Sequence, residues 1–158
     1  MTDATDSFDD DELETWSAFA TLLEWLPAAL DAQLQADSDV THFEFGILFA
    51  LSRADDATLR MSTLAEHANS TLSRLSRAVG RLERRGWVRR SPDPDDGRYT
   101  LARLTPSGRR ATRRAEPGHV ALVRALVLGA LTPTQTRQLR TISRKVTAAI
   151  RDREGWTP

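Results

Sequence analysis

The sequence predicts a mainly α-helical (α+β) fold in which helices flank a single β-hairpin. Apolar residues recur every three or four positions through most of the chain, which is the period of a helix with one buried face. Residues 87–105 depart from this period, because apolar and polar residues alternate there on either side of a turn rich in Pro, Asp and Gly. With 158 residues, of which 40% are hydrophobic, the chain is long enough to bury one core, so we expect a single domain.

The first helix is expected after a short tail. Residues 1–11 are polar and acidic without any period, which predicts a disordered acidic tail. Residues 12–158 then form a single unit, whose first helix covers residues 12–36 with Pro27 as a kink. The apolar positions of this helix are Leu13, Trp16, Phe19, Ala20, Leu23, Leu26, Leu30 and Leu34.

Three further helices are predicted before the hairpin. The first begins at "THFEFGILFALS", where Thr41 and Glu44 have the spacing of a capping box. Helix starts at Ser62 and Ser70 then predict a short helix, a tight turn near residues 67–69 and a longer helix, an arrangement typical of a helix-turn-helix. The longer helix exposes arginine and hydroxyl side chains, and its apolar stripe consists of Leu72, Leu75, Val79 and Leu82.

The hairpin follows this longer helix directly. Gly86 is expected to end the helix, and a strand begins at Trp87 and Val88. "SPDPDDG" forms the turn, and "YTLARLT" returns as the second strand. The hairpin therefore forms a wing beside the helix-turn-helix.

The C-terminal part of the chain is predicted to be helical. Residues 109–131 are interrupted at Pro117 and Gly118, so they form either two helices or one bent helix. The last helix has Thr132 as its cap, followed by a first-turn proline and by a glutamine at capping-box spacing. Its apolar stripe consists of Leu139, Ile142, Val146 and Ile150.

The net charge of zero conceals a strong segregation of charge along the chain. Residues 1–56 hold 14 acidic side chains and one basic side chain, a net charge of −13. Residues 57–110 carry 12 basic and five acidic side chains (+7), and residues 111–158 carry nine and three (+6). Such asymmetry indicates nucleic-acid binding by the basic part, with an ordinary solvated surface as the alternative.

Several classes of function are not expected. The chain has no cysteine, which excludes disulfides, thiolate metal sites and thiol redox sensing. Because it has no phosphate-binding glycine loop and no recognisable catalytic nucleophile, we expect neither an enzyme nor a cofactor. The histidines His42, His67 and His119 lack ligand spacing, so no metal site is expected. No hydrophobic run approaches the ~20 residues of a membrane span, and we expect a cytoplasmic protein without membrane contact.

Residues 41–108 resemble the MarR family of winged helix-turn-helix transcriptional regulators, which act as homodimers. The resemblance lies in "LAEHANSTLSRLSRAVGRLERRGWVRR" and in "DPDDGRYTLARLTPSG", where D-x-R, a strand and L-T-x-x-G follow one another as in the family's wing. It implies a winged helix-turn-helix with a two-stranded β-wing, together with dimerisation helices at residues 12–36 and 109–155. It also implies a sequence-specific DNA-binding repressor. The homodimer would read a pseudo-palindromic operator in double-stranded DNA, with recognition helices ~34–36 Å apart.

Different DNA contacts are expected along the predicted recognition helix. Base edges in the major groove present a distinct pattern of donors and acceptors, so exposed side chains near the helix start can read sequence. Residues farther along the basic surface suit phosphates, which position the protein without specifying sequence. The base-reading candidates are Thr71, Ser73, Arg74 and Arg77, the phosphate candidates are Arg81, Arg84 and Arg90, and Ser70 is expected to cap the helix. The alternative is a solvated arginine face.

Arg98 at the hairpin tip is expected to enter the narrow minor groove, whose negative potential attracts arginine. Asp96 would hold its guanidinium in place, and this pair is similar to the arginine and acidic neighbour of the family's wing. Gly97 departs from the family pattern, in which this position often carries another basic residue, so a single arginine is left at the tip. The alternative is an ordinary surface ion pair, which contributes little.

The resemblance further implies that a small aromatic or phenolic ligand binds between the dimerisation helices and the winged domain. The candidate contacts are Trp16, Trp25, His42 and Phe45, with a place in the core or on the surface as the leading alternative for each. Two other functions remain open, a non-specific architectural DNA binder and a protein-interaction module on a winged-helix scaffold. Only such a module would keep its partner after the combined removal of Arg74, Arg77 and Arg98.

Overall fold

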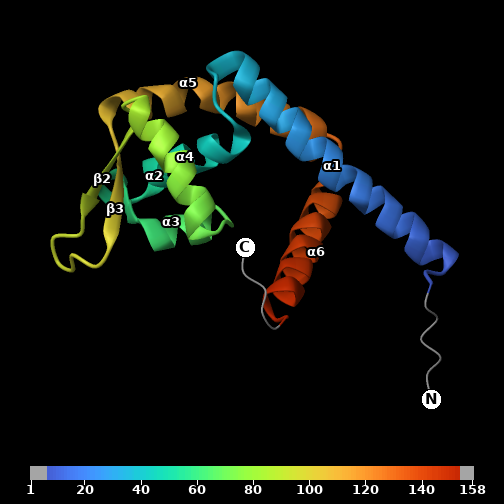
Figure 1. Ribbon diagram of the computed structural model, residues 1–158. Helices are drawn as coiled ribbons and strands as arrows, with labels where there is room; N and C mark the ends of the chain where they lie inside the picture. Colours follow the sequence, from blue (N-terminus) through green and yellow to red (C-terminus); the bar gives the residue numbers. More distant parts are fainter. Residues whose placement is uncertain (1–6, 154–158) are drawn as a thin grey trace.

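The computed structural model describes residues 7–153, which form a mainly helical fold with one small sheet (Figure 1). The helices are α1 (Asp10–Ser38), α2 (His42–Arg53), α3 (Met61–His67), α4 (Leu72–Arg84), α5 (Pro106–Val123) and α6 (Pro133–Arg151), with a short 3-10 turn, η1 (Asp55–Ala57), and a π-helical turn, η2 (Arg124–Leu128). The strands are β1 (Thr58–Arg60), β2 (Val88–Pro92) and β3 (Thr100–Leu104). The predicted fold class, mainly helical with a β-hairpin, is confirmed.

The sheet is antiparallel and contains one strand more than the predicted hairpin. Its order is β1-β3-β2, and the hairpin pairs β2 with β3 so that Val88 lies opposite Leu104. β1 escapes sequence-based prediction because three residues are too few to show the alternation of a strand. This strand connects the wing to the helix-turn-helix, since Arg60 lies opposite Leu101 and directly precedes α3.

α1 begins at Asp10, inside the segment expected to be a disordered tail (residues 1–11). A capping box explains this start: the Asp9 carboxylate accepts a hydrogen bond from the Glu12 amide at 2.8 Å, and the Glu12 carboxylate accepts one from the Asp9 amide at 3.1 Å. The acidic first turn is also stabilised by the positive end of the helix dipole. The expectation of disorder is therefore wrong for Asp10 and Asp11, while residues 1–6 of the expected tail lie outside the described residues.

The starts of α2 and α3 differ in how well the sequence predicts them. The capping box of α2 is confirmed, because the Thr41 hydroxyl accepts a hydrogen bond from the Glu44 amide at 3.1 Å and the Glu44 carboxylate accepts one from the Thr41 amide at 3.2 Å. α3 begins at Met61 and not after a Ser62 cap. The reason is that β1 leads straight into the helix, so Arg60 occupies the cap position without a side-chain hydrogen bond.

α5 is a single helix that continues through Pro117 and Gly118, so of the two alternatives for this segment, two separate helices is wrong. Gly118 instead allows α1 to approach, since a Cβ atom at this position would lie 2.8 Å from the side-chain nitrogen of Gln33. α6 begins as predicted, with the Thr132 hydroxyl accepting a hydrogen bond from the Gln135 amide at 3.3 Å.

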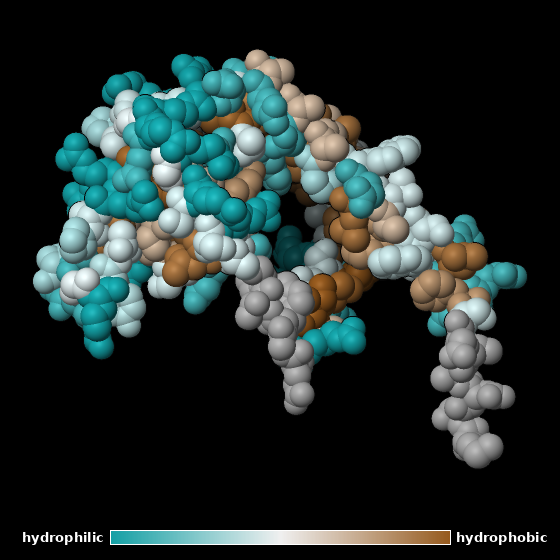
Figure 2. All heavy atoms as spheres, in the orientation of Figure 1, coloured by the Kyte–Doolittle hydropathy of each residue, from teal (hydrophilic) through white to brown (hydrophobic). Residues whose placement is uncertain are grey.

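The core lies among α2, α3, α4, the sheet and the adjoining parts of α1 and α5. Its fully buried apolar side chains are Leu34, Ile47, Leu48, Leu51, Leu64, Leu75, Val79 and Leu82. The N-terminal half of α1 and all of α6 extend away from this body, and hydrophobic surface follows both (Figures 1 and 2). Their exposed apolar side chains include Leu13, Trp16, Phe19, Leu22, Leu23, Ile142, Val146 and Ile150. None of the helices described here combines the length and the apolar character of a membrane span.

Candidate nucleic-acid interface

A left-handed residue closes the turn between α3 and α4. Asn69 adopts φ 46°, a conformation that asparagine accepts more readily than most residues with a side chain. The Ser70 amide donates to the Ala65 carbonyl at 3.0 Å, and the Asn69 amide donates to the Glu66 carbonyl at 3.1 Å. These bonds end α3 abruptly and fix the angle at which α4 leaves the turn. The predicted helix-turn-helix is confirmed.

The cap of α4 is Thr71, and the prediction of Ser70 is wrong. Thr71 Oγ1 accepts a hydrogen bond from the Arg74 amide at 3.2 Å. Ser70 is buried, and its hydroxyl donates to the Thr71 carbonyl at 3.1 Å, because Ser70 still belongs to the turn and the helix is capped one residue later. Thr71 nevertheless remains exposed at the start of α4, and its hydroxyl lies 3.2 Å from that of Ser73.

The polar start of α4 is open to solvent. Ser73, Arg74 and Arg77 are all exposed, as expected for residues that read bases. The Arg74 guanidinium lies 4.3 Å from the centre of the Phe43 ring of α2, a cation–π contact that restricts its direction. The structure thus brings the base-reading candidates together on one exposed surface.

Leu72 is predicted to belong to the buried stripe of α4, but the structure exposes it. Its side chain is 53% exposed, whereas Leu75, Val79 and Leu82 are buried as predicted. Leu72 is the first residue of α4, so it projects beyond the part of the core that covers Leu75. Its helical spacing gives no sign of this exposure, which results from its place at the very start of the helix.

Arg81 contacts α2 and also faces solvent. Its Nε donates to Glu44 Oε1 at 2.6 Å, with the arginine side chain 47% exposed and that of Glu44 only 8% exposed. Glu44 therefore caps α2 and holds α4 at the same time. The sequence does not reveal this ion pair, because the two residues lie 37 positions apart.

Arg90 holds β2 against α4, while Arg84 lies exposed near the end of that helix. Arg90 Nε donates to Glu83 Oε2 at 2.8 Å and its Nη1 donates to Ser76 Oγ at 3.2 Å. Partial burial alone would raise the pKa of Glu83, but the hydrogen bonds and charge of Arg90 keep that pKa below its ordinary value. Two of the three phosphate candidates are therefore already engaged in ion pairs.

At the wing tip, Asp96 orients Arg98. Asp96 accepts hydrogen bonds from Arg98 Nη2 at 2.6 Å, from Arg98 Nε at 2.9 Å and from the Arg98 amide at 3.1 Å. The Arg98 side chain is 83% exposed. The hydrogen bonds that Arg98 donates are the main reason that the pKa of Asp96 lies below its usual range. The hydrogen bond with Asp96 in turn raises the pKa of Arg98. The guanidinium is thus charged and oriented before any partner arrives.

Known proteins share both the sequence of this helix-turn-helix and wing and their arrangement in space. The family model described as MarR family matches residues 38–98. Over nearly its whole length the chain is similar to Sco3205, a MarR family transcriptional regulator from Streptomyces coelicolor whose crystal structure is in complex with DNA. The identity is 39%, the coverage is 99% of this chain and 98% of that chain, and the TM-score is 0.93. The chain belongs to the MarR family.

Two further comparisons show how far the similarity extends. AbsC, a MarR family transcriptional regulator from Streptomyces coelicolor, is 30% identical with a TM-score of 0.90, over 94% of this chain and 100% of that chain. The HTH-type transcriptional regulator YfiV from Bacillus subtilis is 36% identical over 72 residues, 45% of each chain. The chain spans about half the length of the curated relatives it matches.

The four expected ligand contacts do not line one cavity in this MarR-family chain. His42 lines a cavity of about 610 Å³ at the junction of α1, α2, α3 and α4, whereas Phe45 is buried in the core. Trp16 lies on α1 near α6, and Trp25 is 74% exposed elsewhere on α1. Aromatic residue type alone does not distinguish core, surface and cavity, which explains this scatter. The polar lining of the cavity consists of Asp31, His42, His67, Asn69 and Arg74.

Beside this cavity, His119 packs against two aromatic rings at tilted angles. Its ring centre lies 4.7 Å from that of Phe45 and 5.6 Å from that of His42. Burial, and after it the neighbouring His42, lowers the pKa of His119 below its ordinary value. Folding therefore favours the neutral ring, and the unfolded chain binds more protons once the pH falls below the ordinary histidine pKa of ~6.5. Across residues 7–153, no three histidine or acidic side chains are grouped so as to hold a metal ion.

We expect the thermal midpoint of unfolding to fall as the pH is lowered from about 7 to about 5, because protonation of His119 opposes folding in this range. His119→Gln should make the midpoint less dependent on pH. His67→Gln removes an exposed histidine and serves as the control, with the wild-type dependence expected. Thermal unfolding at pH 7, 6 and 5 measures the effect, and equal pH dependence in wild type and His119→Gln would contradict the prediction.

Proposed function

We propose that this chain is a dimeric, sequence-specific DNA-binding transcriptional repressor. The observation that carries the proposal is the combination of an exposed polar start of α4 with an arginine already oriented at the wing tip. α4 enters the major groove, and Arg98 enters an adjacent minor groove while Asp96 holds its guanidinium. The similarity to Sco3205, whose structure contains DNA, supports this proposal.

In this proposal the residues of α4 divide their roles by position. Thr71, Ser73, Arg74 and Arg77 read base edges, and Leu72 adds an apolar contact of the kind that suits a thymine methyl group. Arg84 contacts a phosphate directly, and Arg81 does so through the nitrogens that do not bond Glu44. Arg90 contacts the backbone while it braces the wing against α4.

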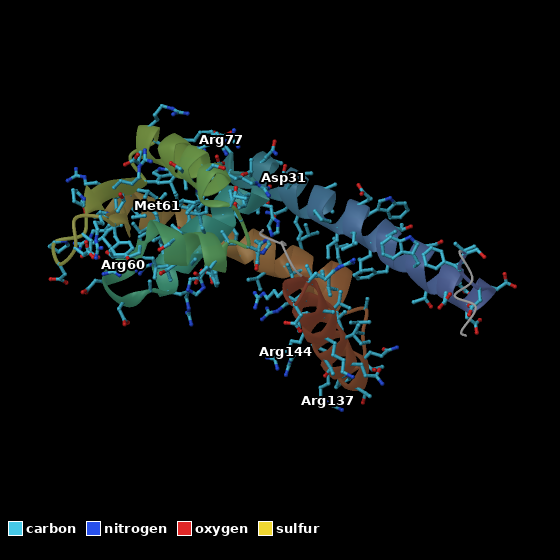
Figure 3. All side chains as sticks on the ribbon, turned by 60° about the horizontal axis from the view of Figure 1, so that its bottom comes forward. Asp31, Arg60, Met61, Arg77, Arg137 and Arg144 are labelled. Atoms are coloured by element: carbon cyan, nitrogen blue, oxygen red, sulfur yellow. The ribbon has the colours of Figure 1, made fainter. Side chains whose placement is uncertain are left out.

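The homodimer is proposed from the apolar surfaces of α1 and α6. These two helices expose more contiguous apolar surface than a monomer normally leaves uncovered. Their charges are complementary, because α6 carries five basic and no acidic side chains, Arg137 and Arg144 among them (Figure 3), whereas the first turn of α1 is acidic. A two-fold pair would place its recognition helices ~34–36 Å apart and read a pseudo-palindromic operator.

A small aromatic or phenolic ligand is proposed to release the repressor from DNA. The cavity of about 610 Å³ has the size of a small-molecule site and lies beside Asp31, which Figure 3 labels on α1. Arg74 lines this cavity and also belongs to the base-reading set, so an occupant that moves Arg74 away from Phe43 would change DNA binding. This function takes place in the cytoplasm and requires neither a catalytic group nor a cofactor.

Salt-titrated binding to a fluorescent pool of genomic fragments, including the region upstream of the protein's own gene, tests the proposal. A few pseudo-palindromic fragments should bind ~10³-fold or more tighter than the rest, with affinity that falls steeply as salt rises. The variant Arg74→Ala/Arg77→Ala should lose this preference and keep weak, salt-dependent binding.

The matched control is Arg110→Ala/Arg114→Ala, which removes the same charge from exposed positions on α5 and should keep the preference. Equal affinity of the wild type for all fragments would instead favour an architectural DNA binder. Absence of binding to any fragment would leave the protein-interaction module.

A further inference from the structure

Arg60 contacts the wing from outside the hairpin. It is the last residue of β1 and the cap residue of α3, so its backbone belongs to the entry of the helix-turn-helix. Its Nε donates to Asp93 Oδ2 at 2.8 Å, and its guanidinium lies 4.4 Å from the centre of the Tyr99 ring. Asp93 is almost buried, with 6% of its side chain exposed, so little water is available to replace this partner. One side chain thus bridges the helix-turn-helix and the wing.

Asp93 and Tyr99 are the two ends of the loop that carries Arg98. The Asp93 amide donates to the Tyr99 carbonyl at 2.9 Å, which closes the loop at its base. Within the loop, the Asp95 amide donates to Asp93 Oδ1 at 3.0 Å, and the Tyr99 amide donates to the Asp96 carbonyl at 3.0 Å. Because Arg60 contacts both ends, it can transmit the orientation of α3 to the loop, and Figure 3 places it beside Met61 at the base of the wing.

The charge of Arg60 also suits this location. Residues 93–99 hold three aspartates and one arginine, so the loop by itself is acidic although it is proposed to approach DNA phosphates. Arg60 pairs with Asp93, while Arg98 pairs with Asp96. Without Arg60, the buried Asp93 would lose its counter-charge, and the base of the loop would lose its contact with β1.

We infer that Arg60 is a positioning residue for the wing: held between Asp93 and Tyr99, it fixes the loop so that Arg98 meets the minor groove. The inference rests on the proposed DNA-binding function. Arg60 itself touches no base, so its contribution to affinity acts through Arg98. It follows that the benefit of Arg60 should largely disappear when Arg98 is absent.

A double-mutant cycle tests this coupling. The probe is a fluorescein-labelled duplex selected by the wild-type protein from a random-sequence library. Arg60→Gln should weaken binding about tenfold when Arg98 is present and less than about twofold in the Arg98→Ala background. Arg60→Lys keeps the charge but not the planar fork, so it should recover only part of the affinity. Equal losses in both backgrounds would overturn the inference, since they would show that Arg60 acts independently of Arg98.

Arg103→Gln is the matched control for the loss of charge. Arg103 lies on β3 in the same sheet, and its Nε donates to the Thr58 hydroxyl at 3.0 Å and not to the wing loop. Its removal should change affinity by the same factor with and without Arg98. Thermal unfolding of each variant distinguishes loss of fold from loss of positioning.

Amide hydrogen exchange tests the positioning without any DNA. In Arg60→Gln, the amides of Arg98 and Tyr99 should exchange about tenfold faster, while those of Val79 and Leu82 in α4 keep their protection. Unchanged exchange at Arg98 and Tyr99 would overturn the inference. If the wild-type protein selects no duplex, the proposed function fails, and the exchange result alone then decides whether Arg60 orders the wing.

Discussion

Arg98→Ala is expected to weaken binding to the duplex preferred by the wild type at least tenfold, about 1–3 kcal/mol, without unfolding the protein. The reason is that Asp96 holds the guanidinium at an exposed tip, so its orientation costs little further entropy on binding. Fluorescence anisotropy at two salt concentrations measures the loss. The affinity of Arg98→Lys for the duplex should lie between the affinities of the wild type and of Arg98→Ala, because lysine keeps the charge but cannot form the bidentate contact with Asp96.

The control for this experiment is Arg113→Ala, which removes an exposed arginine from α5, away from the wing. It should lower affinity only slightly. A result in which Arg98→Ala binds as tightly as the wild type, with the same dependence on salt, would rule out the minor-groove contact and leave an ordinary surface ion pair.

Gly108→Ala is expected to destabilise the fold by about 3 kcal/mol or more. A Cβ atom on Gly108 would overlap the Trp87 carbonyl oxygen and would lie 2.7 Å from Leu104 Cδ1. Trp87 is fixed by its own backbone, since its carbonyl accepts a hydrogen bond from the Thr105 amide at 2.9 Å. The start of α5 would have to move away from the sheet to make room.

Urea denaturation measures this loss, and Gly97→Ala is its matched control. A Cβ atom on Gly97 would meet no atom within 4 Å, so that variant should keep a free energy of unfolding close to that of the wild type. Equal stability of the two variants would show that α5 can shift without cost.

The elements that the sequence predicts well are those whose signals are local. The capping boxes at Thr41 and Thr132 lie within four residues, and both helices begin where these boxes indicate. Pro117 leaves open whether its segment forms one helix or two, and the structure has one because α5 packs against α1 at Gly118, a contact between distant segments that the local sequence does not reveal. The early start of α1 is also local, but the acidic composition before Leu13 outweighs the Asp9 cap when the segment is judged by composition alone.

In the candidate site too, contacts between neighbours in sequence can be predicted and contacts between distant segments cannot. The exposed start of α4 and the Asp96–Arg98 pair are readable because their residues are neighbours in sequence. The contacts of Arg60 and Arg81 join segments 33 and 37 positions apart, and nothing in either segment alone indicates them. The aromatic residues expected at a ligand pocket are dispersed for the same reason, since the burial of Phe45 and the exposure of Trp25 are set by tertiary packing.

Glu44 restricts the substitutions that positions 41, 44 and 81 can accept. One oxygen of its carboxylate accepts a hydrogen bond from the Thr41 amide and the other accepts one from Arg81, so a single side chain contributes both to the start of α2 and to the position of α4. Glutamine could preserve the cap but not the charge, and alanine would remove both side-chain contacts. A substitution at position 44 would therefore disturb contacts of positions 41 and 81 together, so we expect these three positions to change jointly.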